Sequence, residues 1–181
     1  MSSTQTLLHR NKQFAGSFGF ADLPIIPTLR TVILACTDAR VDPAHIFGLE
    51  LGESVVMRNN GGRLTPAVLD EIITLAHLVG GMEGGSAGPF NLAIVQHTRC
   101  GAERFADPEL RRMLRDRAGV DVSASAIDDH RASIHEDVAR LRDDPRVPGH
   151  VTVSALLYDV DTGGVEEVVA PAVVDQLRSS R

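Results

Sequence analysis

The segment Ala-Cys-Thr-Asp-Ala-Arg, residues 35–40, carries a thiol, a carboxylate and a guanidinium at alternate positions. These groups belong to Cys36, Asp38 and Arg40. In an extended chain, side chains two and four positions apart project from the same face. The spacing therefore predicts that the three groups act together at one site.

The second of the two cysteines lies in the segment Gln-His-Thr-Arg-Cys-Gly, where His97 and Cys100 form a His-x-x-Cys pair. Zinc prefers thiolate and imidazole ligands, and three protein ligands leave the fourth tetrahedral position open, as catalytic zinc sites require. The pair alone favours a simpler interpretation, in which buried free thiols accompany a hydrogen-bonded histidine. The Cys-x-Asp-x-Arg motif reverses that preference and predicts a zinc site formed by Cys36, His97 and Cys100.

Asp38 and Arg40 then acquire a chemical role beside the metal. A carboxylate near a zinc-bound water can accept its hydrogen bond and orient it, while a neighbouring guanidinium keeps that carboxylate ionised. The alternative is an ordinary surface ion pair, which contributes little. Because the pair directly follows an apolar segment, the sequence favours the role at the site.

Both motifs follow an apolar segment that is typical of a buried strand, residues 31–35 and residues 90–97. In open α/β sheets, ligand sites form beyond the carboxyl ends of the strands. A right-handed crossover fold can therefore bring the two motifs together, although they lie far apart in the sequence.

The remaining segments alternate between helix and strand patterns, which indicates an α/β domain. We predict a single domain over residues 1–181, with a small, mostly parallel central β-sheet flanked by helices. The predicted strands are residues 31–35, 53–59, 90–97, 150–160 and 165–170, and the predicted helical segments are residues 4–18, 42–52, 65–81, 107–119 and 123–144, with a glycine-rich break at 80–89 and a hairpin turn at 161–164.

The composition excludes several classes of function. A formal net charge of −6 argues against a nucleic-acid surface. No segment approaches the roughly 18 consecutive apolar residues of a membrane helix, and the first residues lack the apolar core of a signal peptide. Two cysteines do not make a secreted disulfide framework, so we expect a cytoplasmic protein.

The two motifs resemble those of the β-class carbonic anhydrase family. Cys-Thr-Asp-Ala-Arg is similar to the family's Cys-x-Asp-x-Arg, and His-Thr-Arg-Cys-Gly to its His-x-x-Cys-Gly. The segments RVDPAHIFGLELGE, VVMRNNGG and VARLRDDPRVPGHVTVSALLYDVDTGGVEEV add to the resemblance, which covers about residues 30–169 in the family's order.

The resemblance implies a β-carbonic-anhydrase-like fold with one Zn²⁺ per chain, bound by Cys36, His97 and Cys100. Asp38 and Arg40 would form the catalytic dyad. The implied reaction is the reversible hydration of CO2 to bicarbonate and a proton, by attack of a zinc-bound hydroxide. In some family members the counterpart of Asp38 instead becomes the fourth zinc ligand and closes the site.

Two other functions stay open at this point. Related proteins use the same zinc centre to hydrolyse CO2 analogues such as carbonyl sulfide or carbon disulfide, and a catalytically silent zinc-binding relative is the third alternative. Retention of Asp38 and Arg40 counts against a silent protein, because a structural zinc needs no oriented open position. The sequence favours the carbonic anhydrase.

The resemblance also implies a homodimer or a higher even oligomer. In the family, the amino-terminal helix packs on the partner subunit. We expect residues 1–28, a helix and its connector, to do so here, with packing inside the same chain as the alternative.

Other polar residues are weaker candidates. We expect His45 to lie on a helix surface rather than to shuttle protons, His77 to pack within its helix, and His130 and His135 to be solvated. The Asn59, Asn60 and Gly61 stretch could supply polar groups near the site, and Asn60 departs from the alanine that is usual in the family. Further departures are Arg99 in place of a frequent aspartate, the absence of paired aspartates after this turn, and the loose glycine-rich break.

Overall fold

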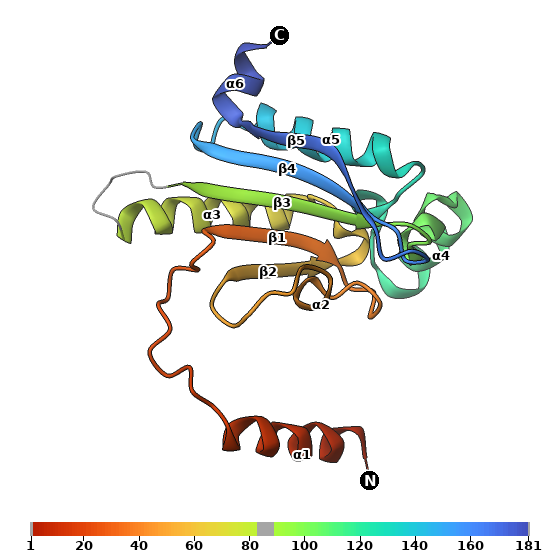
Figure 1. Cartoon of the computed structure of the whole chain (residues 1–181). Helices are drawn as coiled ribbons and strands as arrows, with labels where there is room; N and C mark the ends of the chain where they lie inside the picture. The colour runs from red at the N-terminus through yellow and green to blue at the C-terminus, as the bar shows by residue number, and fades with distance from the viewer. Residues whose placement is uncertain (1, 83–88, 181) are drawn as a thin grey trace.

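A five-stranded sheet forms the centre of the computed structural model, which describes residues 2–82 and 89–180 (Figure 1). The strands lie in the order β2 (Ser54–Asn59), β1 (Thr31–Cys36), β3 (Phe90–His97), β4 (Val151–Tyr158) and β5 (Val165–Val173). The first four are parallel, and β5 runs antiparallel to β4. The predicted fold class and the final hairpin are therefore confirmed, while positions 83–88 of the predicted glycine-rich break lie outside the described residues.

The central strand β1 is buried on both faces, as its continuous apolar sequence predicts. Val32 to Cys36 are all buried. A strand whose two faces both meet other elements cannot alternate polar and apolar residues, because either face would then bury polar groups. β2, at the edge of the sheet, has a mixed pattern and leaves Val56 exposed.

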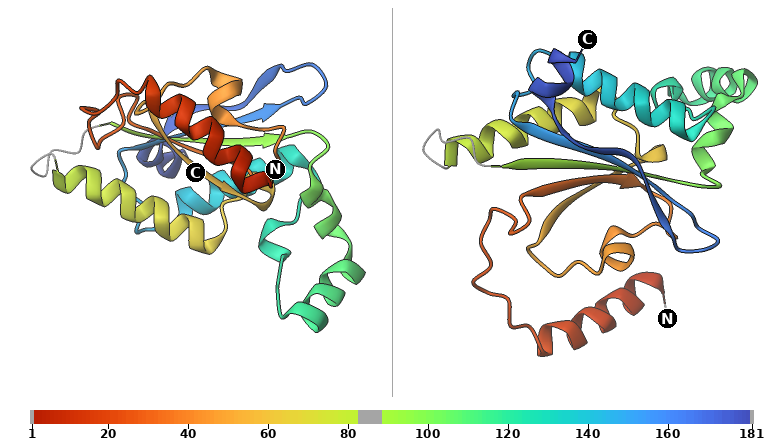
Figure 2. Two further views of the ribbon diagram at one scale, coloured as in Figure 1. Left: turned by 90° about the horizontal axis from the view of Figure 1, so that it is seen from below. Right: turned by 45° about the horizontal axis from the view of Figure 1, so that its top comes forward.

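Helices cover the sheet unequally, as Figure 2 shows. The helices are α1 (Ser3–Gly16), α2 (Pro43–Phe47), α3 (Pro66–Met82), α4 (Pro108–Ala118), α5 (His130–Asp143) and α6 (Val174–Ser179), with short 3₁₀ turns η1 (Asn60–Gly62), η2 (Gly101–Ala106) and η3 (Ser123–Ser125). The main core joins α3, α5 and α6 to one face of the sheet. A smaller apolar cluster on the opposite face includes Phe47 from the end of α2 and Leu49.

The helix α3 follows its sequence signals closely. The Thr65 hydroxyl caps the helix by accepting the Val68 N–H, and Pro66 occupies the first helical position. Ile72, one of the apolar residues on its inner face, is 1% exposed. Full burial of such a side chain stabilises the fold by about 1.5–3 kcal/mol.

Two predictions about helices need correction. The helix predicted over residues 123–144 begins only at His130, because the Asp129 carboxylate accepts the Ala132 N–H and so starts the helix there. Residues 123–125 form the separate turn η3. The second correction concerns α6, which directly follows β5 and was not predicted.

The strand order has a switch point between β1 and β3. From β1 the chain moves to β2 on one side, and later returns to place β3 on the other side of β1. In open α/β sheets a crevice forms at such a point, beyond the carboxyl ends of the strands. Cys36 is the last residue of β1 and His97 the last of β3. The fold therefore brings both predicted motifs to the crevice.

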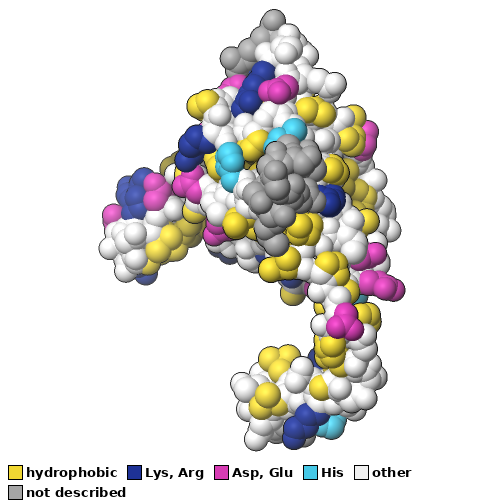
Figure 3. Space-filling model, turned by 90° about the vertical axis from the view of Figure 1, so that its left-hand side faces the viewer, with side chains coloured by type: hydrophobic (Ala, Val, Ile, Leu, Met, Phe, Trp, Pro, Cys, Tyr) yellow, Lys and Arg dark blue, Asp and Glu magenta, His cyan; other side chains and the backbone are white. Residues whose placement is uncertain are grey.

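In the amino-terminal arm, residues 2–28, the helix α1 stands apart from the body of the molecule, while the end of the connector reaches the body, where the Thr28 N–H donates to the Gly52 carbonyl (Figures 1 and 3). The helix α1 has no buried residue. Apolar side chains of the arm are nevertheless numerous, and Leu7, Leu8 and Ile25 are 64%, 58% and 84% exposed. Within one chain this apolar surface is left uncovered.

Candidate metal centre

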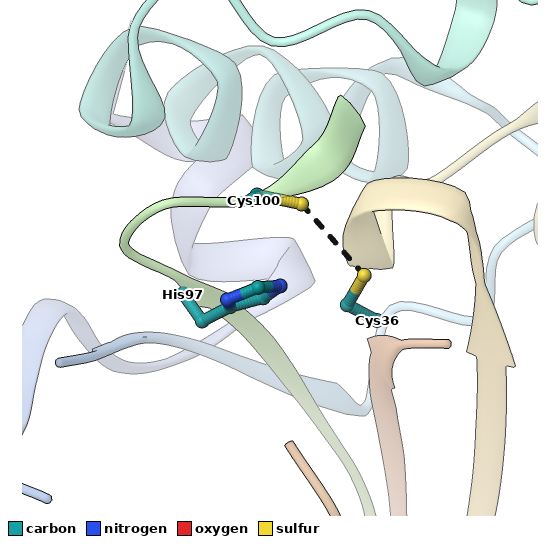
Figure 4. A group of neighbouring side chains, drawn as sticks. All are labelled: Cys36, His97 and Cys100. Atoms are coloured by element: carbon teal, nitrogen blue, oxygen red, sulfur yellow. Dashed lines mark hydrogen bonds between the residues drawn. The ribbon is translucent and has the colours of Figure 1, made fainter. Parts of the chain in front are cut away.

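The side chains of Cys36, His97 and Cys100 converge at the carboxyl end of the sheet (Figure 4). One potential ligand atom from each lies within 4.8 Å of the others. The exposed fractions of the three residues are 4%, 0% and 3%. The structure thus brings the three predicted ligands together in a buried cluster.

The backbone fixes this convergence. β1 and β3 are adjacent and parallel, with Ala35 opposite Val95, so the residues that follow emerge side by side. The chain then turns sharply through Arg99, which has a φ of 54°, and this turn places Cys100 close to Cys36. A left-handed conformation is uncommon outside glycine, so the turn depends on the contacts around it.

His97 presents one ring nitrogen to the two sulfurs. Its Nδ1 donates to the Thr98 carbonyl at 3.0 Å, because a carbonyl can only accept. The proton therefore lies on Nδ1, and Nε2 carries a lone pair. His97 Nε2 is one of the buried side-chain atoms, within the described residues, that have no hydrogen-bond partner. A buried acceptor without a partner costs about 1–3 kcal/mol, which a metal ion at this place would offset.

The two sulfurs have the separation expected of ligands to one ion. Cys36 Sγ and Cys100 Sγ lie 3.7 Å apart, and both cysteines are free. A disulfide would need about 2.05 Å. Two Zn–S bonds of about 2.3 Å at a tetrahedral angle give a separation of about 3.8 Å. The donor set, its spacing and the lone pair of His97 therefore fit zinc.

The thiol pair favours negative charge. A hydrogen bond with the Cys100 thiol lowers the pKa of Cys36 to about 3, although burial opposes this change. The same hydrogen bond raises the pKa of Cys100. The hydrogen-bonded pair therefore favours the loss of one proton, and a thiolate is the form of cysteine that binds a cation.

Asp38 and Arg40 form a two-point ion pair beside the cluster. Asp38 Oδ1 accepts from Arg40 Nε at 3.0 Å, and Oδ2 accepts from Nη2 at 2.7 Å. This contact with Arg40 holds the pKa of Asp38 well below its usual range. Arg40 Nη2 also donates to the Arg99 carbonyl at 3.1 Å, which ties the pair to the turn between His97 and Cys100.

Arg58 supports the backbone on which the pair stands. Its Nε donates to the Cys36 carbonyl at 2.9 Å, and its Nη2 donates to the Asp38 carbonyl at 2.7 Å. One side chain from β2 thus fixes the backbone of both a candidate ligand and the candidate carboxylate. Sequence reasoning did not assign Arg58 to the site, although the residue stands in the VVMRNNGG segment.

The turn η1 forms the opposite side of the site. The Asn59 side chain donates to the Arg63 carbonyl at 2.7 Å and accepts the Arg63 N–H at 2.9 Å, which closes the turn. Asn60 Oδ1 accepts from Thr37 Oγ1 at 3.3 Å. Asn59 therefore shapes the turn, while Asn60 faces the site.

A pocket of about 270 Å³ opens between these elements. It is smaller than the pockets that hold drug-sized ligands, which suits a small substrate. The residues that line it are Cys36, Thr37, Asp38, Asn60, Gly61, Gly101, Ala102 and Phe105.

The other histidines behave differently from one another. His45 and His135 are exposed, as predicted. His77 is also exposed, so the prediction that it packs within its helix is wrong; its Nε2 lies 3.4 Å from the Arg146 carbonyl. His130 is half-buried and hydrogen-bonded to Gln96 and Glu103, so the prediction that it is solvated is wrong. Its partners are remote in sequence, and no local pattern indicated them.

Comparisons with known proteins agree with this geometry. The family model described as carbonic anhydrase matches residues 31–165. Beta-carbonic anhydrase 1 of Mycobacterium tuberculosis is 29% identical over 170 residues, which cover 93% of this chain and 99% of that protein. The crystal structure of carbonic anhydrase from Streptococcus mutans is 32% identical, covers 93% of this chain and 98% of its own, and superposes with a TM-score of 0.74.

A carbon disulfide hydrolase of Saccharolobus solfataricus is also similar, with 28% identity over 160 residues and 74% of each chain covered. The carbonic anhydrase relative matches over a larger share of both chains. With the family model spanning the four parallel strands and both motifs, the chain belongs to the carbonic anhydrase family, in its β class.

Proposed function

We propose that this protein catalyses the reversible hydration of CO2 to bicarbonate and a proton with one Zn²⁺ per chain. The observation that carries the proposal is the buried cluster of two sulfurs and one unpaired imidazole nitrogen, next to an intact Asp38–Arg40 pair. A purely structural zinc would need no oriented carboxylate beside it. The arrangement therefore supports a catalytic site with an open fourth position over a closed one.

Cys36, His97 and Cys100 would hold the metal. Zinc bound there supplies a Lewis acid that lowers the pKa of a water molecule to about 7. The Thr98 carbonyl accepts the Nδ1–H of His97. This hydrogen bond fixes the tautomer in which Nε2, the nitrogen that faces the sulfurs, carries the lone pair. The chain's contribution is thus a preformed set of donors.

Asp38 acts as a hydrogen-bond acceptor at the site. Arg40 keeps the Asp38 carboxylate ionised. An ionised carboxylate can accept hydrogen bonds but cannot donate one. Asp38 therefore selects and orients a hydroxyl group in the pocket. In this structure both carboxylate oxygens face Arg40, and Asp38 is not part of the three-residue cluster. Its alternative role as a fourth ligand would require this pair to break.

The pocket walls suit a small, mostly apolar substrate. Ala102 and Phe105 supply apolar surface, and Thr37 and Asn60 supply polar groups. We infer that the apolar wall holds CO2 while the polar groups contact the more polar bicarbonate. Hydrolysis of carbon disulfide remains the second candidate, because the similar Saccharolobus solfataricus protein is a carbon disulfide hydrolase.

Stopped-flow CO2 hydration on protein of known zinc content tests the proposal. We expect one zinc per chain and a fast rate that rises between about pH 6.5 and about pH 9, as the pKa of about 7 requires. Cys100→Ser should lose both zinc and activity, whereas His45→Ala, a change on an exposed helix, should keep both. One zinc per chain without CO2 turnover would contradict the proposal, and assays with carbon disulfide and carbonyl sulfide would then separate a hydrolase from a silent relative.

We also propose that the chain, as one domain over residues 1–181, assembles as a homodimer or a higher even oligomer. Support comes from the amino-terminal arm, whose apolar side chains its own chain leaves exposed. Residues 1–28 would cover this surface by packing on the partner subunit. Sedimentation of the wild type should give an even oligomer, and the double change Leu7→Ser and Leu8→Ser should shift it toward the monomer. An unchanged mass would contradict this use of the arm.

We propose a cytoplasmic location, because a reducing compartment keeps both thiols available as ligands. Cell fractionation would test it. In the part of the chain that the structure describes, no helix has the length and apolar character needed to cross a membrane.

A further inference from the structure

His130 lies beside the segment that carries two of the candidate zinc ligands, His97 and Cys100. It is the first residue of α5, and 17% of its side chain is exposed. Its Nδ1 lies 3.1 Å from Gln96 Oε1, and its Nε2 lies 3.0 Å from Glu103 Oε1. Gln96 belongs to β3 and Glu103 to η2, so one imidazole connects three elements.

Both residues that contact His130 are close in sequence to a candidate zinc ligand. Gln96 directly precedes His97 and is fully buried. Glu103 uses the same oxygen, Oε1, to accept the backbone N–H of Cys100 at 2.9 Å. A continuous path of covalent and hydrogen bonds therefore runs from His97 through His130 to Cys100.

The chemistry of the path constrains the Cys100 backbone. The Glu103 carboxylate accepts both from His130 Nε2 and from the Cys100 N–H. The Glu103 side chain is 46% exposed, so without the histidine it would be free to take other rotamers. The carboxylate would then release the Cys100 N–H, and the direction of the Cys100 sulfur would no longer be fixed.

We propose that His130 is a positioning residue for the metal centre: it holds Glu103 against the Cys100 backbone and thereby sets the affinity of the cluster for zinc. The inference rests on the zinc site proposed above. It adds a residue outside both sequence motifs, on a helix that contributes no ligand. The role differs from general packing, because it acts through one acceptor oxygen that two donors share.

Zinc affinity measured by competition with a chelating dye tests this role, with denaturation of the metal-free protein as the second measurement. His130→Ala should weaken zinc binding about 10- to 100-fold, the usual effect of losing a residue that orients a ligand. His135→Ala, an exposed change on the same helix, should leave the affinity within about twofold of the wild type. His130→Gln should restore most of the affinity, because its amide nitrogen can reach Glu103 as Nε2 does.

The design separates positioning from structural support. The denaturation midpoints of metal-free His130→Ala and His130→Gln should agree while their zinc affinities differ. A zinc affinity of His130→Ala equal to that of His135→Ala would overturn the proposal. Equal zinc affinities of His130→Ala and His130→Gln would overturn it too.

If His130→Ala does not fold, comparison of His130→Gln with His130→Asn decides. Only the glutamine amide reaches Glu103, so the glutamine variant should bind zinc more tightly, and equal affinities would overturn the proposal. Wild-type protein that binds zinc without hydrating CO2 would remove the proposed activity alone and leave these ratios to decide the role of His130. Wild-type protein that binds no zinc would overturn both.

Discussion

Arg63 and Asp137 form a buried ion pair that joins the turn after β2 to helix α5. Arg63 Nε donates to Asp137 Oδ2 at 2.7 Å, and Nη2 donates to Oδ1 at 3.2 Å. The two side chains are 4% and 0% exposed. Because Arg63 directly follows η1, which lines the pocket, this pair anchors one wall of the metal site to the helix that carries His130.

Replacing Asp137 with asparagine should destabilise the fold by about 3–5 kcal/mol, because it removes the buried counter-charge of the Arg63 guanidinium and leaves only the exposed Glu136 carboxylate to pair with it. Chemical denaturation of the two proteins would measure the difference. Glu136 provides a matched control, since it contacts the same guanidinium at 3.1 Å but is 66% exposed. Glu136→Gln should cost less than about 1 kcal/mol. Similar losses in the two variants would contradict the importance of burial here.

Asp38→Asn should retain zinc and lower the CO2 hydration rate by about 10²-fold or more, because the amide is a weaker acceptor and no longer pairs with Arg40. Asp116→Asn, a change on the exposed helix α4, is the control and should leave the rate unchanged. Metal analysis and stopped-flow rates on the same samples would decide. A normal rate in Asp38→Asn would exclude the carboxylate from catalysis.

The pH dependence of Asp38 follows from the direction of its pKa shift. The contact with Arg40 lowers the pKa in the folded state, so the folded protein binds this proton less tightly than the unfolded chain does. Stabilisation from the pair is then present above the unfolded value of about 3.9 and is lost as the pH falls through the folded-state pKa. Asp38→Asn should therefore leave the shape of the hydration profile between about pH 6.5 and about pH 9 unchanged. A changed shape would mean that Asp38 titrates in that range.

Gly62→Ala should destabilise the fold far more than Gly163→Ala. Both glycines have a positive φ, 61° and 74°, so alanine costs about 1–2 kcal/mol of backbone energy at either position. At Gly62 a Cβ atom would also lie 2.8 Å from the Val95 carbonyl oxygen, whereas at Gly163 nothing lies within 4 Å. Overpacking adds about 1–3 kcal/mol. Equal denaturation midpoints would show that η1 does not need this close approach to β3.

Asn60→Ala should weaken bicarbonate affinity about two- to tenfold, the loss expected for one hydrogen bond of about 0.5–1.5 kcal/mol. The Asn60 amide oxygen accepts from Thr37 Oγ1, so the amide nitrogen is the group that can donate to a ligand oxygen in the pocket. The bicarbonate dehydration KM would measure the effect, with Asn11→Ala on α1 as the control. An unchanged KM would place Asn60 outside the substrate contacts.

Sequence periodicity predicted the parts of the fold that depend on local patterns. The continuous apolar run of β1 and the capped, periodic helix α3 both carry their signal within a few residues. The candidate metal cluster was also predictable, because Cys36 and His97 each end a buried strand and parallel strands end at the same edge. The start of α5 was not, since the apolar spacing continues through residues 123–129 while the Asp129 cap starts the helix later.

The supporting contacts of the site had no comparable signal. His130 and Glu103 are 27 positions apart, and Arg63 and Asp137 are 74 apart. Their partnership depends on how α5 packs beside the sheet, which single-sequence patterns do not specify. The structure was therefore needed to find the residues that support the candidate site, although the sequence identified the three residues that converge there.

The isolated position of α1 makes its own folding depend on assembly. The capping box between Ser2 and Gln5 satisfies local hydrogen bonds, but a helix of 14 residues with no buried side chain is only marginally stable in water. If the arm folds against a partner, dilution below the dissociation constant would unwind α1 and leave the sheet intact. Far-ultraviolet circular dichroism would then lose helical signal as the protein is diluted, so that the secondary structure of the chain becomes a function of its concentration.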